Sequence, residues 1–279
     1  MLRPYLRLYW RVLKHAVVAF GNDRAGTMGA AIAFYTLFSL APLLVLIIAV
    51  AGFVYGDDAA RGAVDDQLVG IVGADSAKAV QAMVENAGNL GTGLIATGLG
   101  LLTMMVAATT VFGQIQDALN VIWKTEPSRT GAWSLLHTRL MSLLLIFCLG
   151  LLLLASLVIN ALLAGFSETL NDKVPFMGTI LQIVNFLISF GILTALFALV
   201  YRLLPDTHIQ WRDVWLGGAV TALLFVIGRQ LVALYLGHTG AASTYGAAGS
   251  LIVVLLWVYY SAQIFLFGAE ITRSYAAIR

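Results

Sequence analysis

The chain has 279 residues, of which 60% are hydrophobic and only 11% are charged, and its formal net charge is +2. Ordinary soluble domains carry about 25% charged residues, so composition excludes a soluble globular protein and predicts an all-α integral membrane protein. The single cysteine, Cys148, excludes a disulfide framework and a cysteine-based metal site.

Residues 1–25 are predicted to form an amphipathic helix that lies in the membrane interface. Basic residues recur on one face of this helix, and apolar residues fill another. The basic residues are Arg3, Arg7, Arg11 and Lys14, and the apolar ones are Leu2, Leu6, Tyr9, Trp10, Leu13 and Val17. Such a helix favours membrane lipids with anionic headgroups. A nucleic-acid-binding arm is the rival interpretation, but the aromatic face fits a lipid interface better.

Six apolar segments are each long enough to cross about 30 Å of hydrocarbon at about 1.5 Å per helical residue. The predicted transmembrane helices cover residues 28–54, 93–123, 135–165, 176–204, 214–236 and 247–275. The largest segment outside the membrane, residues 56–92, is acidic and is predicted to form two short helices. The chain is therefore predicted to be one membrane domain, residues 1–279.

Six spans place both chain ends on one side of the membrane, and the positive-inside rule selects that side. Most basic residues fall in segments on the side of the termini. They are Arg3, Arg7, Arg11, Lys14, Arg24, Lys124, Arg129, Arg139, Arg202, Arg212, Arg273 and Arg279. This distribution predicts an N-in, C-in orientation, with the acidic 56–92 segment as a periplasmic helical loop.

The first predicted span contains a proline, Pro42. Proline removes one backbone hydrogen bond and kinks a helix. Ser39 lies three residues earlier, where its hydroxyl is placed to satisfy a freed carbonyl. Two interpretations stay open for this pair, a structural kink and a hinge used in gating.

Arg229, in the fifth predicted span, is the most unusual single residue. An arginine inside a span is costly unless it is paired or hydrated. Asn160, Gln182 and Asn185 fall at a comparable depth, so we expect a polar patch in the periplasmic half of the bundle. Three interpretations stay open: an internal hydrogen-bonded staple, a long arginine side chain that snorkels outward, or a site for an anionic headgroup or an ion path.

The last predicted span follows a turn of small residues, 243–250, and keeps several polar side chains within its apolar run. Trp257, Gln263 and Glu270 are among them, and polar groups inside a span must face protein or water. This segment is therefore predicted to be the most constrained wall of the bundle. Arg273 is the expected partner of Glu270, and the alternative for Glu270 is a proton-coupling carboxylate.

The second predicted span ends with three polar residues, Gln114, Asp117 and Asn120, at i, i+3 and i+6. This spacing is interpreted as one shared helix face. Asp117 and Arg139 both lie at the cytoplasmic depth, and we expect them to pair across the second and third spans.

The sequence carries no recognisable enzyme signature. The four histidines, His15, His137, His208 and His238, have no paired-ligand spacing. It contains neither a GxxxxGK[ST] phosphate-binding loop nor a Gly-x-Ser-x-Gly elbow. We therefore expect no catalytic residues, no cofactor, no metal site and no nucleic-acid partner.

Several motifs resemble the YihY/BrkB family of bacterial inner-membrane proteins, and the resemblance covers about residues 10–275. The motifs are Tyr35-Thr-Leu-Phe-Ser-Leu-Ala-Pro42, Asp117-Ala-Leu-Asn120 to Trp123, Thr244-Tyr-Gly246, Gly249-Ser250, Leu256-Trp-Val-Tyr259 and Leu266-Phe-Gly-Ala-Glu270. The family-motif positions are Tyr35, Asn120, Trp123, Tyr245, Gly246, Gly249, Trp257, Tyr259 and Gly268.

The resemblance implies a multi-pass protein of the bacterial inner membrane, in a family linked to serum resistance and to envelope or lipid phenotypes. Some members were labelled ribonuclease BN, but a metal-dependent nuclease needs clustered acids and histidines, which this sequence does not offer. We expect a transporter or translocator of an envelope component, either a lipid or an anionic amphiphile. The alternative is a non-transporting envelope scaffold or virulence factor. Small-xxx-small pairs such as Ala96 and Gly100 permit contacts within one chain and within a homo-oligomer alike.

Overall fold

The computed structural model describes residues 3–72, 74–88, 94–125, 140, 143–145, 147–148, 151, 177–239 and 247–278. These residues form long helices and contain no strand, which confirms the all-α class. The helices are α1 (Arg3–Asn22), α2 (Ala25–Tyr55), α3 (Asp57–Val72), α4 (Ala74–Gly88), α5 (Leu94–Trp123), α7 (Met177–Leu203), α8 (Trp211–Thr239) and α10 (Ala247–Ile278). Their bounds lie within a few residues of the predicted segments.

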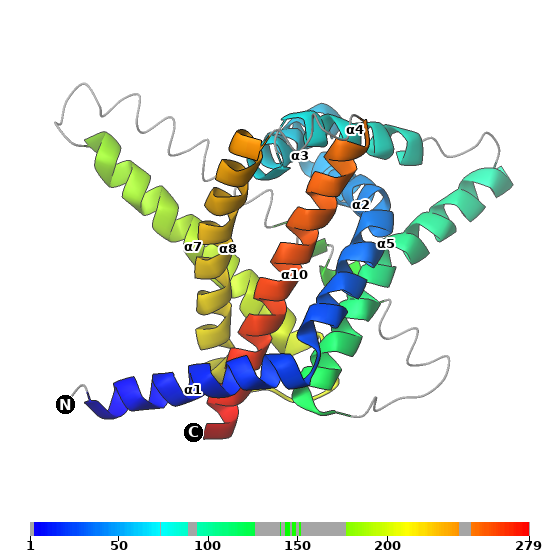
Figure 1. The fold of residues 1–279 in the computed structure, drawn as a ribbon. Coiled ribbons are helices and arrows are strands. Elements are labelled where there is room, and N and C mark those ends of the chain that lie inside the picture. The colour runs from blue at the N-terminus through cyan, green and yellow to red at the C-terminus, as the bar shows by residue number, and fades with distance from the viewer. Residues whose placement is uncertain are drawn as a thin grey trace.

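Helices α2, α5, α7, α8 and α10 run between the two ends of the molecule (Figure 1). Helix α1 lies across one end, beside the C-terminal part of α10, and α3 and α4 lie across the other end. We call these the α1 end and the α3–α4 end. The first and last described helices thus meet at the same end, and the six-span, N-in, C-in arrangement stays a prediction.

Four of the described helices are long and apolar enough to cross a membrane. The stretches that qualify are Ala25–Phe53, Ile183–Leu203, Trp211–Leu231 and Leu251–Ile278. Large apolar side chains stay exposed on them, with Phe53 as much as 93% exposed, which is typical of a surface that faces lipid. The predicted 93–123 segment is the helix α5, and the predicted 135–165 segment lies almost entirely outside the described residues.

The α1 end is held by an apolar cluster to which α2, α5, α7, α8 and α10 all contribute. Its fully buried side chains include Leu119, Ile122, Tyr201, Leu204 and Leu266. A second cluster packs α3 and α4 onto α2 and α10. The acidic segment between α2 and α5 is therefore a packed helical cap over the α3–α4 end.

Helices α8 and α10 cross in close contact because glycines face side chains of the other helix. Gly217 meets Thr272, and Gly268 meets Thr221. A Cβ atom at position 217 would also lie 2.7 Å from the backbone oxygen of Gly268. Tyr201 of α7 reaches this crossing, with its hydroxyl 2.8 Å from Thr221 Oγ1. The crossing fixes α10, and with it the polar residues of the last span, against α7 and α8.

The turn between α7 and α8 is fastened to the end of α5 through Asp206. Asn120 Nδ2 donates to Asp206 Oδ2 over 2.9 Å, and the Asp206 amide donates back to Asn120 Oδ1 over 2.8 Å. Gln116 Nε2 donates to the other carboxylate oxygen over 3.2 Å. Because Asn120 and Gln116 are buried, these bonds set the position of the last turn of α5.

The predicted common face of Gln114, Asp117 and Asn120 is wrong. Asn120 faces Asp206 together with Gln116, whereas Asp117 is exposed. Residues four apart differ by only about 40° around a helix, and residues six apart differ by about 120°. The inward face of α5 therefore follows the four-residue spacing.

Replacing Gly217 by alanine should destabilise the protein, because the added methyl group meets a backbone oxygen that has little room to move. Over-packing of this kind costs about 1–3 kcal/mol. The measurement is the thermal unfolding midpoint of the purified protein in detergent. Gly191→Ala on α7 is the matched control, since a Cβ at this position meets nothing within 4 Å. Equal midpoints for the two variants would contradict the close crossing.

Replacing Asn120 by alanine should also lower the unfolding midpoint, because the Asp206 carboxylate loses a donor and its amide loses an acceptor. Hydrogen bonds to charged groups contribute about 1.5–3 kcal/mol each. Gln114→Ala, on the same helix but outside this set of bonds, is the control. In an Asp206→Asn background the Asn120→Ala substitution should cost less. A cost that does not change would show that the two side chains are not coupled.

Candidate functional site

A cluster of charged side chains lies at the α1 end, where three parts of the chain meet. Asp23 comes from the turn between α1 and α2, Lys124 from the end of α5, and Arg273 from α10. Lys124 Nζ pairs with Asp23 Oδ1, and Arg273 Nη1 lies 3.7 Å from Asp23 Oδ2. The Asp23 side chain is only 7% exposed, against 52% for Lys124. One buried carboxylate thus collects two basic groups.

Left-handed backbone conformations at helix ends place Asp23 and Lys124 at the α1 end. The Asp23 amide still donates to Ala19 over 2.8 Å, and the next residue, Arg24, takes a left-handed conformation with φ 53°. The chain can then turn and begin α2 at Ala25. Lys124 has φ 53° as well and ends α5 in the same way. Both charged side chains therefore sit at sharp helix ends.

Glu270 lies beside this cluster with no exposed surface. Neither of its carboxylate oxygens has a hydrogen-bond partner among the described residues. Asp23, Arg273 and Lys124 supply the charges that act on it. The predicted pairing of Glu270 with Arg273 is wrong in detail, because within 4.0 Å Arg273 pairs with Asp23. The partner of the Arg273 guanidinium comes from the turn before α2. The spacing of residues along α10 could not predict a partner from another segment.

A cavity of about 230 Å³ lies next to the charged cluster. Its lining residues are His15, Val18, Ala19, Asn22, Asp23, Lys124 and Arg273. His15 Nδ1 lies 3.0 Å from Ser274 Oγ, which ties α1 to α10 at the cavity wall. The cavity therefore borders Asp23 at the α1 end.

Gln263 joins α10 to the first turn of α2. Its Nε2 donates to the Gly26 carbonyl over 3.3 Å, and its side chain lies against Gly29. A side chain at position 29 would displace the amide. Gln263 therefore holds the start of α2, and the Asp23 turn before it, next to the span that carries Glu270.

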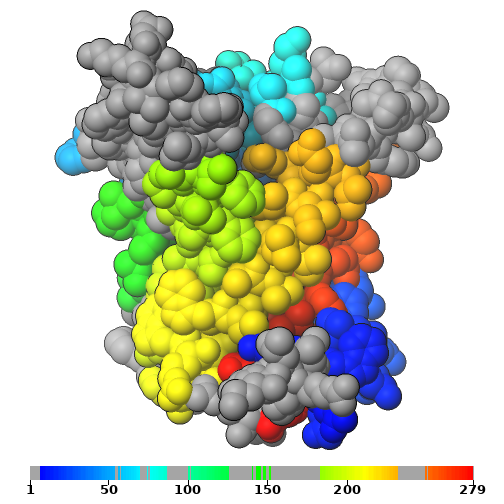
Figure 2. Space-filling model, turned by 90° about the vertical axis from the view of Figure 1, so that its left-hand side faces the viewer, coloured from blue at the N-terminus to red at the C-terminus, as the bar shows by residue number. Residues whose placement is uncertain are grey.

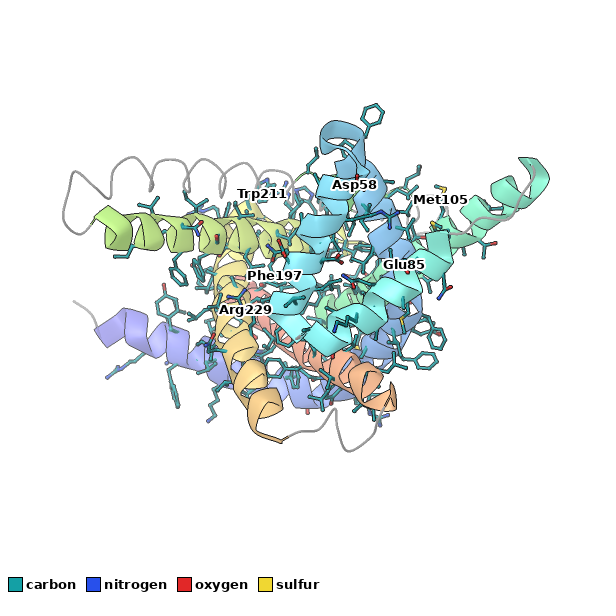
Figure 3. All side chains as sticks on the ribbon, turned by 90° about the horizontal axis from the view of Figure 1, so that it is seen from above. Asp58, Glu85, Met105, Phe197, Trp211 and Arg229 are labelled. Carbon is teal, nitrogen blue, oxygen red and sulfur yellow. The ribbon has the colours of Figure 1, made fainter. Side chains whose placement is uncertain are left out.

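The predicted patch around Arg229 is only partly described. Arg229 lies on α8 (Figure 3) and is exposed. The Asn185 Oδ1 atom is buried on α7 and has no hydrogen-bond partner among the described residues. Asn160 and the side chain of Gln182 lie outside those residues. No bond joins Arg229 to Asn185 in the part of the chain that the structure describes, and the grouping stays a prediction.

The remaining predicted site residues are placed as follows. Asp117 is exposed, and Arg139, its expected partner, lies outside the described residues. Ser39 is buried, and α2 continues through Pro42 to Tyr55. The hinge interpretation of Pro42 stays a prediction.

The family-motif residues fall into three groups. Gly249, Trp257 and Gly268 are buried in α10, and the Trp257 ring lies 5.4 Å from the Phe225 ring of α8. Asn120 and Trp123 lie at the end of α5, where Asn120 binds Asp206. The others are Tyr35 and Tyr259, which are exposed, and Tyr245 and Gly246, which lie outside the described residues. Most of the placed motif positions thus serve helix packing.

Sequence reasoning missed Asp23. Its signal was present, since Asp23 is the first acid in the chain and the next one is Asp57. An isolated acid at the end of a basic amphipathic helix needs a basic partner when it is buried. No group of three or more potential metal-ligating side chains occurs within the described ranges. The arrangement of Asp23, Lys124, Glu270 and Arg273 brings two acidic and two basic side chains together at the α1 end.

The chain matches the family model described as Virulence factor BrkB over residues 16–278. A UPF0761 membrane protein of Rhodospirillum centenum is 30% identical over 270 residues, covering 94% of this chain and 57% of that protein. One of Ralstonia nicotianae is 26% identical, covering 99% and 60%, and one of Tolumonas auensis is 25% identical, covering 98% and 85%.

This chain spans less than two thirds of the length of the first of these relatives. No solved structure matches it at a significant level. The family match covers almost the whole chain, and the apolar helices agree with a membrane protein. The chain belongs to the BrkB family, whose curated relatives are UPF0761 membrane proteins.

Proposed function

We propose that this chain resides in the bacterial inner membrane and translocates an anionic amphiphile of the cell envelope, with Arg229 as the group that meets the anionic headgroup. The observation that carries the proposal is an exposed arginine inside a membrane-span candidate. Arg229 lies in the stretch Trp211–Leu231 and has no ion pair with any other described residue. Such a charge is costly in a membrane unless it is paired or hydrated, and a lipid phosphate would provide the pair.

The register of α8 directs Arg229 toward α7. Gly218, Phe225 and Arg229 follow one another at spacings that keep them on one helix face. A Cβ at Gly218 would lie 2.8 Å from the Thr194 oxygen of α7, and the Phe225 ring lies 5.9 Å from the Phe197 ring of α7. Arg229 continues this face toward the α3–α4 end, where α7 diverges from α8 (Figure 1). Arg229 therefore lies next along the α8 face that packs against α7, and its own side chain is exposed.

The surfaces of α1 support a membrane with anionic lipids at the α1 end. Helix α1 buries one side against α10 through Val12 and Ala16. A second side exposes apolar residues, and a third exposes basic ones. The exposed apolar residues are Tyr9, Trp10, Leu13 and Val17, and the exposed basic residues are Arg7, Arg11 and Lys14. Figure 2 shows the blue residues of α1 at the lower right, beside the lower part of the face formed by α7 and α8.

The opposite end carries acidic side chains, which supports an orientation with the α1 end in the cytoplasm. Asp58 on α3 and Glu85 on α4 are exposed there (Figure 3), and Asp66 is exposed as well. In this orientation Arg229 lies in the periplasmic half of the bundle, and an anionic headgroup would meet it from the periplasmic leaflet.

The test is lipid translocation by the purified protein in vesicles that contain phosphatidylglycerol. Fluorescent phosphatidylglycerol is incorporated, and quenching by dithionite outside the vesicles reports its movement between leaflets. The wild type should move the lipid faster than empty vesicles do. Arg229→Leu should slow it about tenfold, which corresponds to about 1.4 kcal/mol, and Arg229→Lys should keep part of the rate.

Arg61→Leu is the matched control, because Arg61 is an exposed arginine of α3. It should leave the rate unchanged at an equal level of reconstituted protein. A rate for Arg229→Leu equal to that of the wild type would remove Arg229 from the proposal. A wild type that moves lipid no faster than empty vesicles would overturn translocation of this lipid and favour the non-transporting scaffold.

A further inference from the structure

We propose that Asp23 and Glu270 form a proton-binding site, in which one proton is held between the two carboxyl groups at the α1 end. This proposal does not depend on lipid translocation, because it concerns only the protonation of the folded protein. It assigns a ligand, the proton, to a pair of acids of which sequence analysis singled out only Glu270. The two acids come from opposite parts of the chain, the α1–α2 turn and the last helix.

The first observation is the isolation of Glu270. Its side chain has no exposed surface, and both of its oxygens lack a hydrogen-bond donor among the described residues. The Oδ2 atom of Asp23 is also buried and lacks a hydrogen-bond partner there, although Arg273 is 3.7 Å away. The two carboxyl groups are neighbours. As two carboxylates they offer only acceptors to each other, and a proton on one of them supplies the missing donor.

The second observation is that the basic side chains of the cluster pair with Asp23 and not with Glu270. Lys124 and Arg273 both form their ion pairs with Asp23. Glu270 forms no ion pair within 4.0 Å in the part of the chain that is described. A buried carboxyl group without a paired cation is far more stable in its neutral form. The proton therefore belongs to Glu270, with Asp23 as the charged acceptor.

Among the described residues, the other elements packed around Glu270 do not supply a competing charge. On α1, His15 lies within hydrogen-bond distance of Ser274, and Arg24, in the turn before α2, is exposed. Helix α8 meets this part of α10 through Gly217 and Thr221, neither of which titrates. Apart from Asp23, the charges that act on Glu270 are those of Arg273 and Lys124.

The cavity of about 230 Å³ beside Asp23 gives the site a route for proton exchange. It reaches Asp23 and is lined by residues of α1, α5 and α10. Loss of the proton would place two like charges side by side in a buried setting, where each opposes the other. The contact between α10 and the α1–α2 turn would then loosen, so the site links protonation to the position of the interfacial helix.

The test is infrared spectroscopy of the protein in lipid nanodiscs at neutral pH. The carbonyl stretch of a protonated carboxyl group is separate from the carboxylate bands, and labelling with ¹³C-glutamate shifts only the bands of glutamate. We expect one protonated-glutamate band in the labelled wild type and its loss in Glu270→Gln. Glu85→Gln, at an exposed position on α4, is the matched control and should keep the band.

The labelled wild type keeps the proposal falsifiable even when the Glu270→Gln variant does not fold. A wild type without a protonated-glutamate band at neutral pH would overturn the proposal, and so would a band that persists in folded Glu270→Gln. A band that disappears when sodium replaces choline at constant ionic strength would assign the site to a metal cation instead. None of these readings needs lipid movement, so failure of the translocation assay and failure of this proposal are distinguishable.

Discussion

The burial of one carboxyl group, that of Glu270, constrains the arrangement of the whole α1 end. Helices α8 and α10 cross so closely that Gly217 lies against Thr272 and Gly268 lies against Thr221. This crossing shields the last span on one side. The polar neighbours of Glu270 must then come from the other side, where the α1–α2 turn and the end of α5 bring Asp23 and Lys124. The interfacial helix is thereby joined to the span bundle by charge as well as by apolar packing.

Asp206 and Glu270 both lie at the α1 end, but they differ in the hydrogen bonds that their carboxyl groups accept. The Asp206 carboxylate accepts hydrogen bonds from Asn120 Nδ2 and Gln116 Nε2, and the Asp206 amide donates to Asn120 Oδ1, so that Asp206 joins α5 to the turn between α7 and α8. Glu270 has no donor among the described residues. An acid whose oxygens accept hydrogen bonds stabilises one geometry, whereas a buried acid without donors responds to a change in protonation. The contrast is the physical reason for assigning structure to one and proton binding to the other.

The sequence predicted the features that depend on local pattern. Long apolar runs predicted the helix bounds, and the spacing of Arg7, Arg11 and Lys14 predicted the exposed basic face of α1. The polar side chains within the last span predicted that this span packs against protein. Contacts between distant segments could not be predicted from the sequence. Asn120 and Asp206 are 86 residues apart, and His15 and Ser274 are 259 apart. Such pairs depend on where helices cross, and the crossing is set by glycines whose partners the sequence does not reveal.

Helix α10 connects the Glu270 region with the arginine on α8. It touches α8 at Gly217, near Glu270, and again where Tyr260 lies against Gly228, the residue before Arg229. Both contacts leave no room for even a methyl group, and closely packed interfaces move as units because they cannot deform continuously. A shift of α10 that follows the loss of a proton at Glu270 would therefore act on α8 at both contacts. Through these two contacts, loss of the proton at Glu270 would shift Arg229, the residue proposed to meet the lipid headgroup.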